Sequence, residues 1–257
     1  MKIIVCVKVV PEEQDIKITA DGALSLERAK ATISMYDLNA IEAGAQLVEA
    51  HGGTLTAVSV GAGNIDDSKL KKNILSRGPE SLVMIADDRL ENMDTHQTAQ
   101  ALKAAIAKAG DYDLILCGEG SADVYAQQVG IQLGQMMGIP VINFVNQLVP
   151  QDGRLMVERA LEDETETLEI PLPAVVSVTS AINLPRIAGM KEILAAGKKP
   201  GTVLKATEAD IPELTAAIDV ISTQAPDRVE RKQDIVEGDS DEAIKSFLDK
   251  IRDALKE

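Results

Sequence analysis

Short apolar runs alternate with longer amphipathic stretches along the first 150 residues of this 257-residue chain. The runs at 2–7, 54–60, 81–86, 113–117 and 141–146 are rich in Val, Ile and Leu and each predict a strand. The stretches between them repeat apolar residues every three or four positions, as helices do. Because such alternation connects parallel strands through helices, it predicts an α/β fold with a doubly wound, mainly parallel sheet.

Acidic residues mark where we expect the helices to begin, since carboxylates accept hydrogen bonds from unpaired amides at a helix start. One of them is followed three residues later by Gln97, as in a capping box. Glycines follow the helices, at 52–53, 78, 110 and 138. The expected helix starts are Asp37, Asp66 or Asp67, Asp94 and Asp123.

The pattern changes after residue 150. Runs at 155–161 and 166–170 predict a β-hairpin, and 174–179 a further strand. From 183 to about 231 periodicity is poor, which suits an extended arm lying on a partner. Residues 239–256 predict a final helix with Phe247, Ile251 and Leu255 on one face. We therefore divide the chain into an α/β domain (1–182) and a C-terminal extension (183–257).

The composition excludes several classes of protein. The formal charge of −15 opposes binding to nucleic acid or to an anionic membrane. Two cysteines argue against a disulfide framework and for a reducing compartment, which we take to be the cytoplasm. The uncharged stretch 124–151 holds many amide side chains and Pro140, so we interpret it as a helix, a turn and a buried strand instead of a membrane span.

No catalytic or metal motif is present in the sequence. It contains no phosphate-binding P-loop, no GxGxxG after the first strand and no HExxH, and it has two histidines in all. Cys6 and Cys117 fall on apolar strands, where buried and inert thiols are expected. We expect neither catalytic residues nor a metal site.

The most informative segment joins the strand at 113–117 to a glycine-rich loop and a helix start. Gly118 and Gly120 let a ligand approach the backbone, and helix-start amides attract a diphosphate. Ser121, Gln127 and Gln128 add neutral donors. A plain helix cap explains the same pattern, and the spacing leaves both interpretations open.

Other strand ends point to the same edge of the sheet, where ligands of open α/β sheets bind. Lys8 follows the first strand and Val60 ends the second. Residues 34–37 precede the first long helix, where they can close the site. Apolar walls with backbone donors suit an adenine ring. The fold is therefore expected to be Rossmann-like and to bind an adenine nucleotide, although Tyr36 as a packing aromatic and Lys8 as a solvated strand end remain open.

Several segments resemble one family along nearly the whole chain, in the same order. They are MKIIVCVKVVPEEQDIKI (1–18), YDLNAIEA (36–43), LSRGP (75–79), the segment 113–130, VERALE (157–162), LPAVV (172–176), NLPR (183–186) and MKEI (190–193). The chain resembles the β subunits of electron transfer flavoproteins, and among them the bacterial branch of the Fix and carnitine type.

This resemblance implies an electron-carrier subunit, not an enzyme. It implies a heterodimer with an α subunit that carries the redox FAD, and acyl-CoA dehydrogenase-type and quinone reductase-type flavoproteins as partners. The β subunits hold AMP or, in bifurcating members that oxidise NADH, a second FAD. Tyr36 matches the position near the α-bound flavin, and Met190 the anchor of the loop that recognises dehydrogenases. The implied nucleotide-binding residues are Cys6, Lys8, Ser34, Tyr36, Asp37, Val60, Gly118, Glu119, Gly120, Ser121, Asp123, Ala126, Gln127, Gln128, Val129 and Gly130.

The choice between AMP and FAD stays open. Residues 127–130 read QQVG, near the wording of bifurcating members, whereas Tyr125 stands where a small residue is usual. Two other functions are alternatives. A stand-alone adenine-nucleotide sensor of the universal-stress-protein type has a similar sheet but no use for the arm, and a nucleotide-transfer enzyme needs a Ser-Gly-Gly loop where this chain has KVVP (8–11). The donor, the acceptor and the direction of electron flow are not specified by the sequence.

Overall fold

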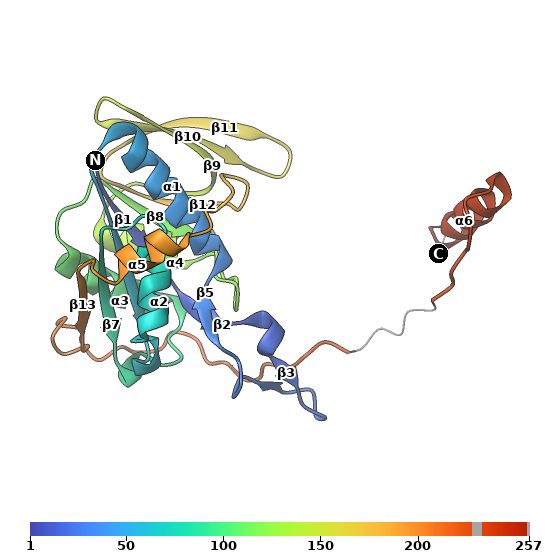
Figure 1. Cartoon of the computed structure of the whole chain (residues 1–257), viewed down its shortest axis with the longest axis horizontal. Helices are drawn as coiled ribbons and strands as arrows, with labels where there is room; N and C mark the ends of the chain where they lie inside the picture. The colour runs from blue at the N-terminus through green and yellow to red at the C-terminus, as the bar shows by residue number, and fades with distance from the viewer. Residues whose placement is uncertain (228–232, 256–257) are drawn as a thin grey trace.

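A mixed, mostly parallel sheet forms the centre of the molecule. The computed structural model describes residues 1–227 and 233–255, and within them nine strands pair in the order β11-β10-β9-β12-β8-β1-β6-β7-β13 (Figure 1). The nine strands are β1 (Lys2–Cys6), β6 (Thr54–Gly61), β7 (Ser81–Ala86), β8 (Leu114–Gly118), β9 (Val141–Gln151), β10 (Arg154–Ala160), β11 (Thr165–Pro171), β12 (Ala174–Val178) and β13 (Gly201–Leu204).

The order of the parallel strands creates a switch point. From β1 the chain moves to β6 and then β7 on one side, and then crosses to β8 on the other side of β1. Strand β12 inserts between β8 and β9, and β10 and β11 extend the sheet as antiparallel neighbours. The carboxyl ends of β1 and β8 therefore lie side by side at the place where α/β sheets bind ligands.

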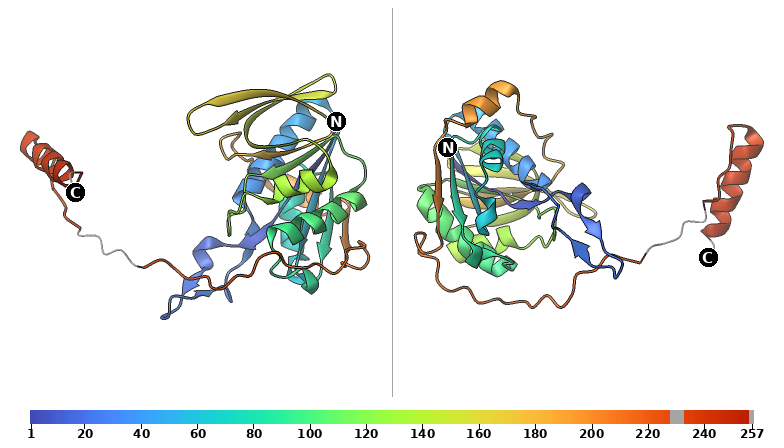
Figure 2. Two further views of the ribbon diagram at one scale, coloured as in Figure 1. Left: turned by 180° about the vertical axis from the view of Figure 1, so that it is seen from behind. Right: turned by 60° about the horizontal axis from the view of Figure 1, so that its bottom comes forward.

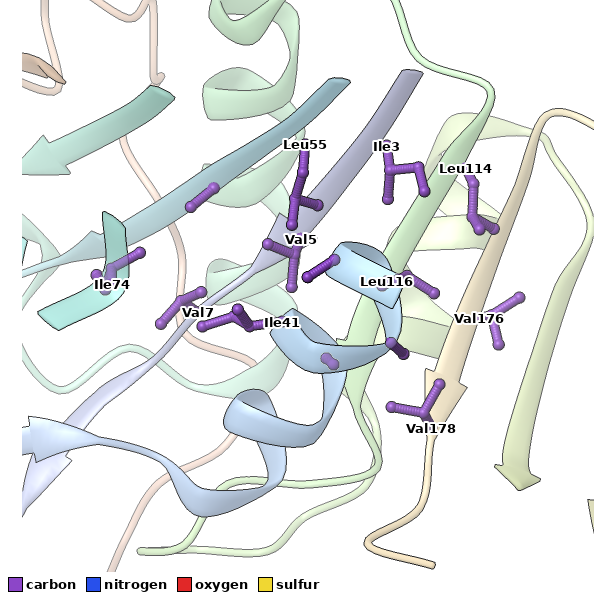
Figure 3. Close-up of a cluster of buried hydrophobic side chains, with 14 of the residues drawn as sticks. Ile3, Val5, Val7, Ile41, Leu55, Ile74, Leu114, Leu116, Val176 and Val178 are labelled. Carbon is purple, nitrogen blue, oxygen red and sulfur yellow. The ribbon is translucent and has the colours of Figure 1, made fainter. Parts of the chain in front are cut away.

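Helices cover both faces of the sheet, which confirms the predicted doubly wound α/β fold. Helices α1 and α2 cover one face and α3 and α4 the other, and Figure 2 shows the second face. Side chains alternate between two apolar clusters, as the period of two requires. In Figure 3, Ile41 of α1 lies among Val5, Val7 and Leu116 of the sheet. The helices are α1 (Met35–His51), α2 (Ser68–Leu75), α3 (Thr95–Ala109), α4 (Val129–Met137), α5 (Met190–Ala196) and α6 (Asp241–Ala254).

Most predicted elements lie where the pattern placed them. Asp67 caps α2, and Asp94 with Gln97 forms the capping box of α3. The predicted hairpin is β10–β11. Two short antiparallel pairs between β1 and α1 were not predicted. They are β2 (Val9–Pro11) with β5 (Ala31–Ile33), and β3 (Lys17–Ile18) with β4 (Leu24–Ser25).

Two predicted helix starts were wrong. Asp37 lies inside the first turn of α1, which begins after Ser34, and its carboxylate binds amides outside the helix. Helix α4 begins at Val129, not at Asp123, because Tyr125 and Gln127 have φ values of 49° and 56°. A left-handed residue interrupts a right-handed helix. Within the uncharged stretch, β9 is also longer than expected and mostly half-buried.

The segment after residue 182 is not an arm throughout. Helix α5 packs near α2, and β13 joins the main sheet beside β7. Ala206, Ala209 and Ile211 are buried in the core cluster under α3. Pairing with the open edge at β7 stabilises the four-residue strand β13, which its own sequence pattern does not predict. The division at residue 182 stays a prediction.

The last described element is the predicted terminal helix. Helix α6 presents Ile244, Phe247, Leu248 and Ile251 as exposed side chains, and Figure 1 draws it apart from the sheet. The predicted end at Lys256, like the end of the weak segment near Arg231, lies outside the described residues. In the described part of the chain, no helix is long and apolar enough to cross a bilayer.

Candidate functional site

Three segments meet at the carboxyl ends of β1 and β8. They are the residues after β1, the start of α1, and the loop of residues 118–128 that leads from β8 to α4. Hydrogen bonds between these segments hold six of the predicted residues together. The six are Lys8, Ser34, Asp37, Gly118, Ser121 and Asp123.

Asp37 stands at the centre of this arrangement. Its Oδ2 accepts a hydrogen bond of 2.7 Å from the amide of Lys8, and its Oδ1 one of 3.2 Å from the amide of Gly118. The side chain belongs to α1 and the two amides to different strand ends, so three elements meet at one carboxyl group. Only 6% of Asp37 is exposed.

Burial gives the Asp37 carboxyl unusual acid–base behaviour. Removal from water disfavours the charged form and raises the pKa of Asp37 to about 7. The amides of Lys8 and Gly118, and the charge of Lys8, act in the opposite direction but do not offset the burial. The carboxyl group therefore titrates near neutral pH.

The ammonium group of Lys8 crosses the site to the loop. Its Nζ lies 2.7 Å from Oδ2 of Asp123 and 3.3 Å from Oγ of Ser121. Burial alone would raise the pKa of Asp123, but the hydrogen bonds from Lys8 and Ser121 lower it overall. Lys8 thus supplies a positive charge at the mouth of the site, already paired with a carboxylate.

Ser34 joins the loop to the start of α1. It is fully buried, and its Oγ accepts a hydrogen bond of 3.3 Å from the amide of Ala122. Its own amide donates to the carbonyl of Lys8 at 3.0 Å. Ser34 therefore fixes both the residue after β1 and the glycine-rich loop.

Two tyrosines lie over the glycine-rich loop. The ring centroids of Tyr36 and Tyr125 are 4.9 Å apart, a normal distance for an aromatic pair. A Cβ atom at Gly120 would come within 2.6 Å of the Tyr125 ring, so glycine is needed for this approach. The pair brings together Tyr36, which the family resemblance places near the α-bound flavin, and Tyr125, which stands where a small residue is usual.

The start of α4 lies beyond the loop. Gln128 precedes the helix and its side chain makes no capping hydrogen bond, so the first-turn amides are left for another acceptor. Gly130 packs so closely against Ser177 of β12 that a Cβ atom at Gly130 would lie 2.3 Å from Oγ of Ser177. Ala126 and Gln127 are half-buried in the turn before the helix.

Other predicted residues border the site without joining its hydrogen bonds. Cys6 is buried beneath it beside Cys117, and this contact and burial raise the pKa of the Cys6 thiol. Val60 is buried at the end of β6. Oε1 of Glu119 accepts from the amide of Ser180 at 3.4 Å, on the side of β12.

The sequence pattern did not single out Ser59, which lies near the end of β6. Its hydroxyl is buried, and in the described part of the chain it has no hydrogen-bond partner. Such groups are rare, because an unpaired buried hydroxyl costs about 1–3 kcal/mol. It lies on β6 one residue beyond the Cys6–Val58 pair. Ser59 is fully buried, and a serine within an apolar strand was the available signal.

Met190 lies away from these residues. It begins α5 and is 72% exposed, with Ile187 and Leu194 nearby and also exposed. A cavity of about 560 Å³ lies between this segment and α1, and Arg186 lines it.

An ion-pair cluster that the sequence did not predict fixes the start of the α5 segment. Nε of Arg186 donates to Glu42 at 2.6 Å and its Nη1 to Glu49 at 2.5 Å, and these bonds raise the pKa of Arg186. The Nδ2 atom of Asn183 donates to the carbonyl of Asn39 at 3.0 Å. The segment is therefore tied to α1.

The groups that meet at this edge are hydrogen-bond donors and one buried carboxyl group. Among the described residues no group of three or more His, Cys, Asp or Glu side chains could hold a metal ion. Glycine backbone, hydroxyls, one ammonium group and the α4 amides are the donors that phosphates prefer.

A family model described as the electron transfer flavoprotein domain matches residues 22–209 of the chain.

Proposed function

The chain belongs to the electron transfer flavoprotein family, whose members carry electrons, and on this premise we propose that it is the β subunit of a two-chain carrier. Its partner would be an α subunit that holds the redox FAD. A flavin accepts and donates one or two electrons, whereas the protein positions it and its partners. The carrier would pass electrons between acyl-CoA dehydrogenase-type flavoproteins and another flavoprotein or a quinone reductase.

The chain itself would hold AMP or a second FAD at the carboxyl ends of β1 and β8. The observation that carries this proposal is the convergence of Lys8, Ser34, Asp37 and the loop at Gly118 on the switch point of the sheet. The phosphates would bind the loop of residues 118–121 and the α4 amides.

Exposed apolar surfaces support a role in a complex. Leu184, Ile187 and Met190 are each more than 70% exposed near α5, and α6 exposes a row of apolar side chains. Surfaces of this kind mark interaction sites. The first would receive the dehydrogenase and the second the α subunit. A stand-alone nucleotide sensor has no need of either.

The test is to purify the tagged chain from its native cells and to analyse the complex. We expect a second chain in equal amount and absorbance near about 450 nm from bound flavin. Chromatography of the released nucleotides then separates a simple carrier, with one FAD and one AMP, from a complex with two FAD. Bleaching of the second FAD by NADH would indicate bifurcation. A stable, colourless monomer without nucleotide would contradict the proposal.

A further inference from the structure

We propose that Asp37 is a positioning residue that clips the end of β1 to the end of β8, and that it does not itself contact the nucleotide. This inference rests on the proposed nucleotide site. It separates Asp37 from the other predicted binding residues, among which the family resemblance had placed it.

The geometry of the carboxylate supports this role. Each oxygen accepts from a different strand end, at 2.7 Å from the amide of Lys8 and at 3.2 Å from the amide of Gly118. These strands are neighbours in the sheet, and their backbone pairing ends at the Val5–Leu116 pair. Beyond that pair, Asp37 connects the two strand ends through one side chain.

Asp37 binds the two segments that would contact phosphate. Lys8 carries the ammonium group, and Gly118 begins the glycine-rich loop. The start of α1 approaches Gly118 so closely that a Cβ there would lie 2.7 Å from both Oδ1 of Asp37 and the backbone carbon of Tyr36. Asp37 thus sets the spacing between the two phosphate-contacting segments.

Burial keeps the carboxylate away from a ligand. Both oxygens face backbone amides, and 94% of the residue's surface is covered, since only 6% is exposed. The charged or titratable groups that face it are Lys8, Asp123 and the thiol of Cys6. A carboxylate in contact with phosphate would repel it, so a role through the backbone also suits the charges.

Asp113 offers a matched control at the opposite edge of the same two strands. Its Oδ2 accepts a hydrogen bond of 2.7 Å from the amide of Lys2, which begins β1, and Asp113 directly precedes β8. It is therefore a second carboxylate tie between β1 and β8, far from the glycine-rich loop. Replacing either carboxylate by its amide puts an NH₂ group where one acceptor was.

The experiment compares Asp37→Asn and Asp113→Asn in the complete complex, stripped of nucleotide and titrated with AMP and with FAD. We expect Asp37→Asn to weaken binding of the preferred nucleotide at least tenfold and Asp113→Asn to change it less than twofold. Equal effects of the two variants would overturn the proposal.

Amide resonances of the wild-type protein give a test that needs neither a variant nor a ligand. The amide protons of Lys8 and Gly118 should shift together with one midpoint near pH 7, the pKa of Asp37, whereas the amide of Lys2 should not share it. Titration of these two amides with different midpoints would overturn the clip. If they titrate together but neither nucleotide binds, the clip stands and the proposed nucleotide site fails.

Discussion

The ammonium group of Lys8 lies 2.7 Å from one carboxylate oxygen of Asp123 and 2.8 Å from the other. The ion pair joins the end of β1 to the loop that follows β8, and both side chains are partly exposed. A phosphate that approaches this loop must therefore compete with Asp123 for Lys8. The positive charge nearest the glycine-rich loop is partly neutralised before any ligand arrives.

We predict that Asp123→Asn tightens the binding of AMP, because it frees Lys8 and removes a negative charge. The expected gain is about fivefold, or about 1 kcal/mol, at low salt, and it should shrink at high salt. Isothermal titration at two salt concentrations measures it. Asp111→Asn, which breaks the exposed pair of Lys2 with Asp111 at 3.0 Å, is the control and should have no effect. Weaker binding by Asp123→Asn would instead indicate that its carboxylate holds the nucleotide.

The pKa of Asp37 predicts a pH dependence of stability. Burial raises this pKa from 3.8 to about 7, so between these values the folded protein holds a proton that the unfolded chain has lost. The free energy of unfolding should therefore fall as the pH rises from about 4 to about 7, and this contribution should be constant above. The difference between the two pKa values corresponds to a decrease of roughly 4 kcal/mol in the free energy of unfolding.

Urea unfolding of wild type and Asp37→Asn across this pH range measures the effect. The variant cannot titrate at this position, so the difference between the two curves isolates Asp37 from the many other carboxylates. A difference that stays constant between pH 4 and pH 8 would refute the raised pKa.

The two loop glycines should respond differently to alanine. At Gly118 the new Cβ would lie 2.7 Å from the backbone carbon of Tyr36, and backbone of the first turn of α1 cannot move cheaply. We expect Gly118→Ala to cost about 2 kcal/mol of stability and to abolish nucleotide binding. At Gly120 the Cβ would meet the exposed ring of Tyr125, which can rotate away.

Thermal unfolding and nucleotide titration compare the two variants. Gly120→Ala should cost less than about 1 kcal/mol and should mainly separate Tyr125 from Tyr36. If both substitutions proved equally harmless, the close approach of α1 to β8 would be in error.

Arg186 should anchor the α5 segment through Glu42. The Glu42 side chain is 6% exposed, so removing its partner leaves a buried carboxylate. We expect Arg186→Ala to cost about 2 kcal/mol, less than for a fully buried pair because Arg186 is one-third exposed. It should also speed proteolysis within residues 187–199.

Glu49→Gln is the matched control, since it removes the exposed half of the same cluster. It should change stability by less than about 0.5 kcal/mol and leave the proteolysis rate unchanged. Urea unfolding and timed digestion give both values. Equal effects of the two substitutions would show that Glu42 does not depend on Arg186.

Local patterns were sufficient for the elements of the sheet core. β1, β7 and the capping box at Asp94 follow from residues within one window of sequence, because apolar periodicity and capping act over a few positions. β13 could not be predicted in this way. Its four residues are a strand because β7 leaves an edge open to them, and that edge exists only in the folded sheet.

The candidate site was likewise predictable only in part. The sequence placed Lys8, Gly118 and Ser121 at strand ends, and the parallel sheet brings them to one edge. It did not predict that residues 121–128 form a loop, since nothing local marks Tyr125 or Gln127 for a positive φ.

The sequence alone therefore determined the kind of fold and the family to which the chain belongs. Only the tertiary structure decided the partners of the charged groups: Asp37 with two backbone amides, Lys8 with Asp123, and Arg186 with Glu42. The physical reason is the distance along the chain over which each effect acts. Periodicity and capping are properties of neighbouring residues, whereas the pairing and the pKa of a carboxylate depend on burial and on groups that lie 29, 81 or 144 positions away in the chain.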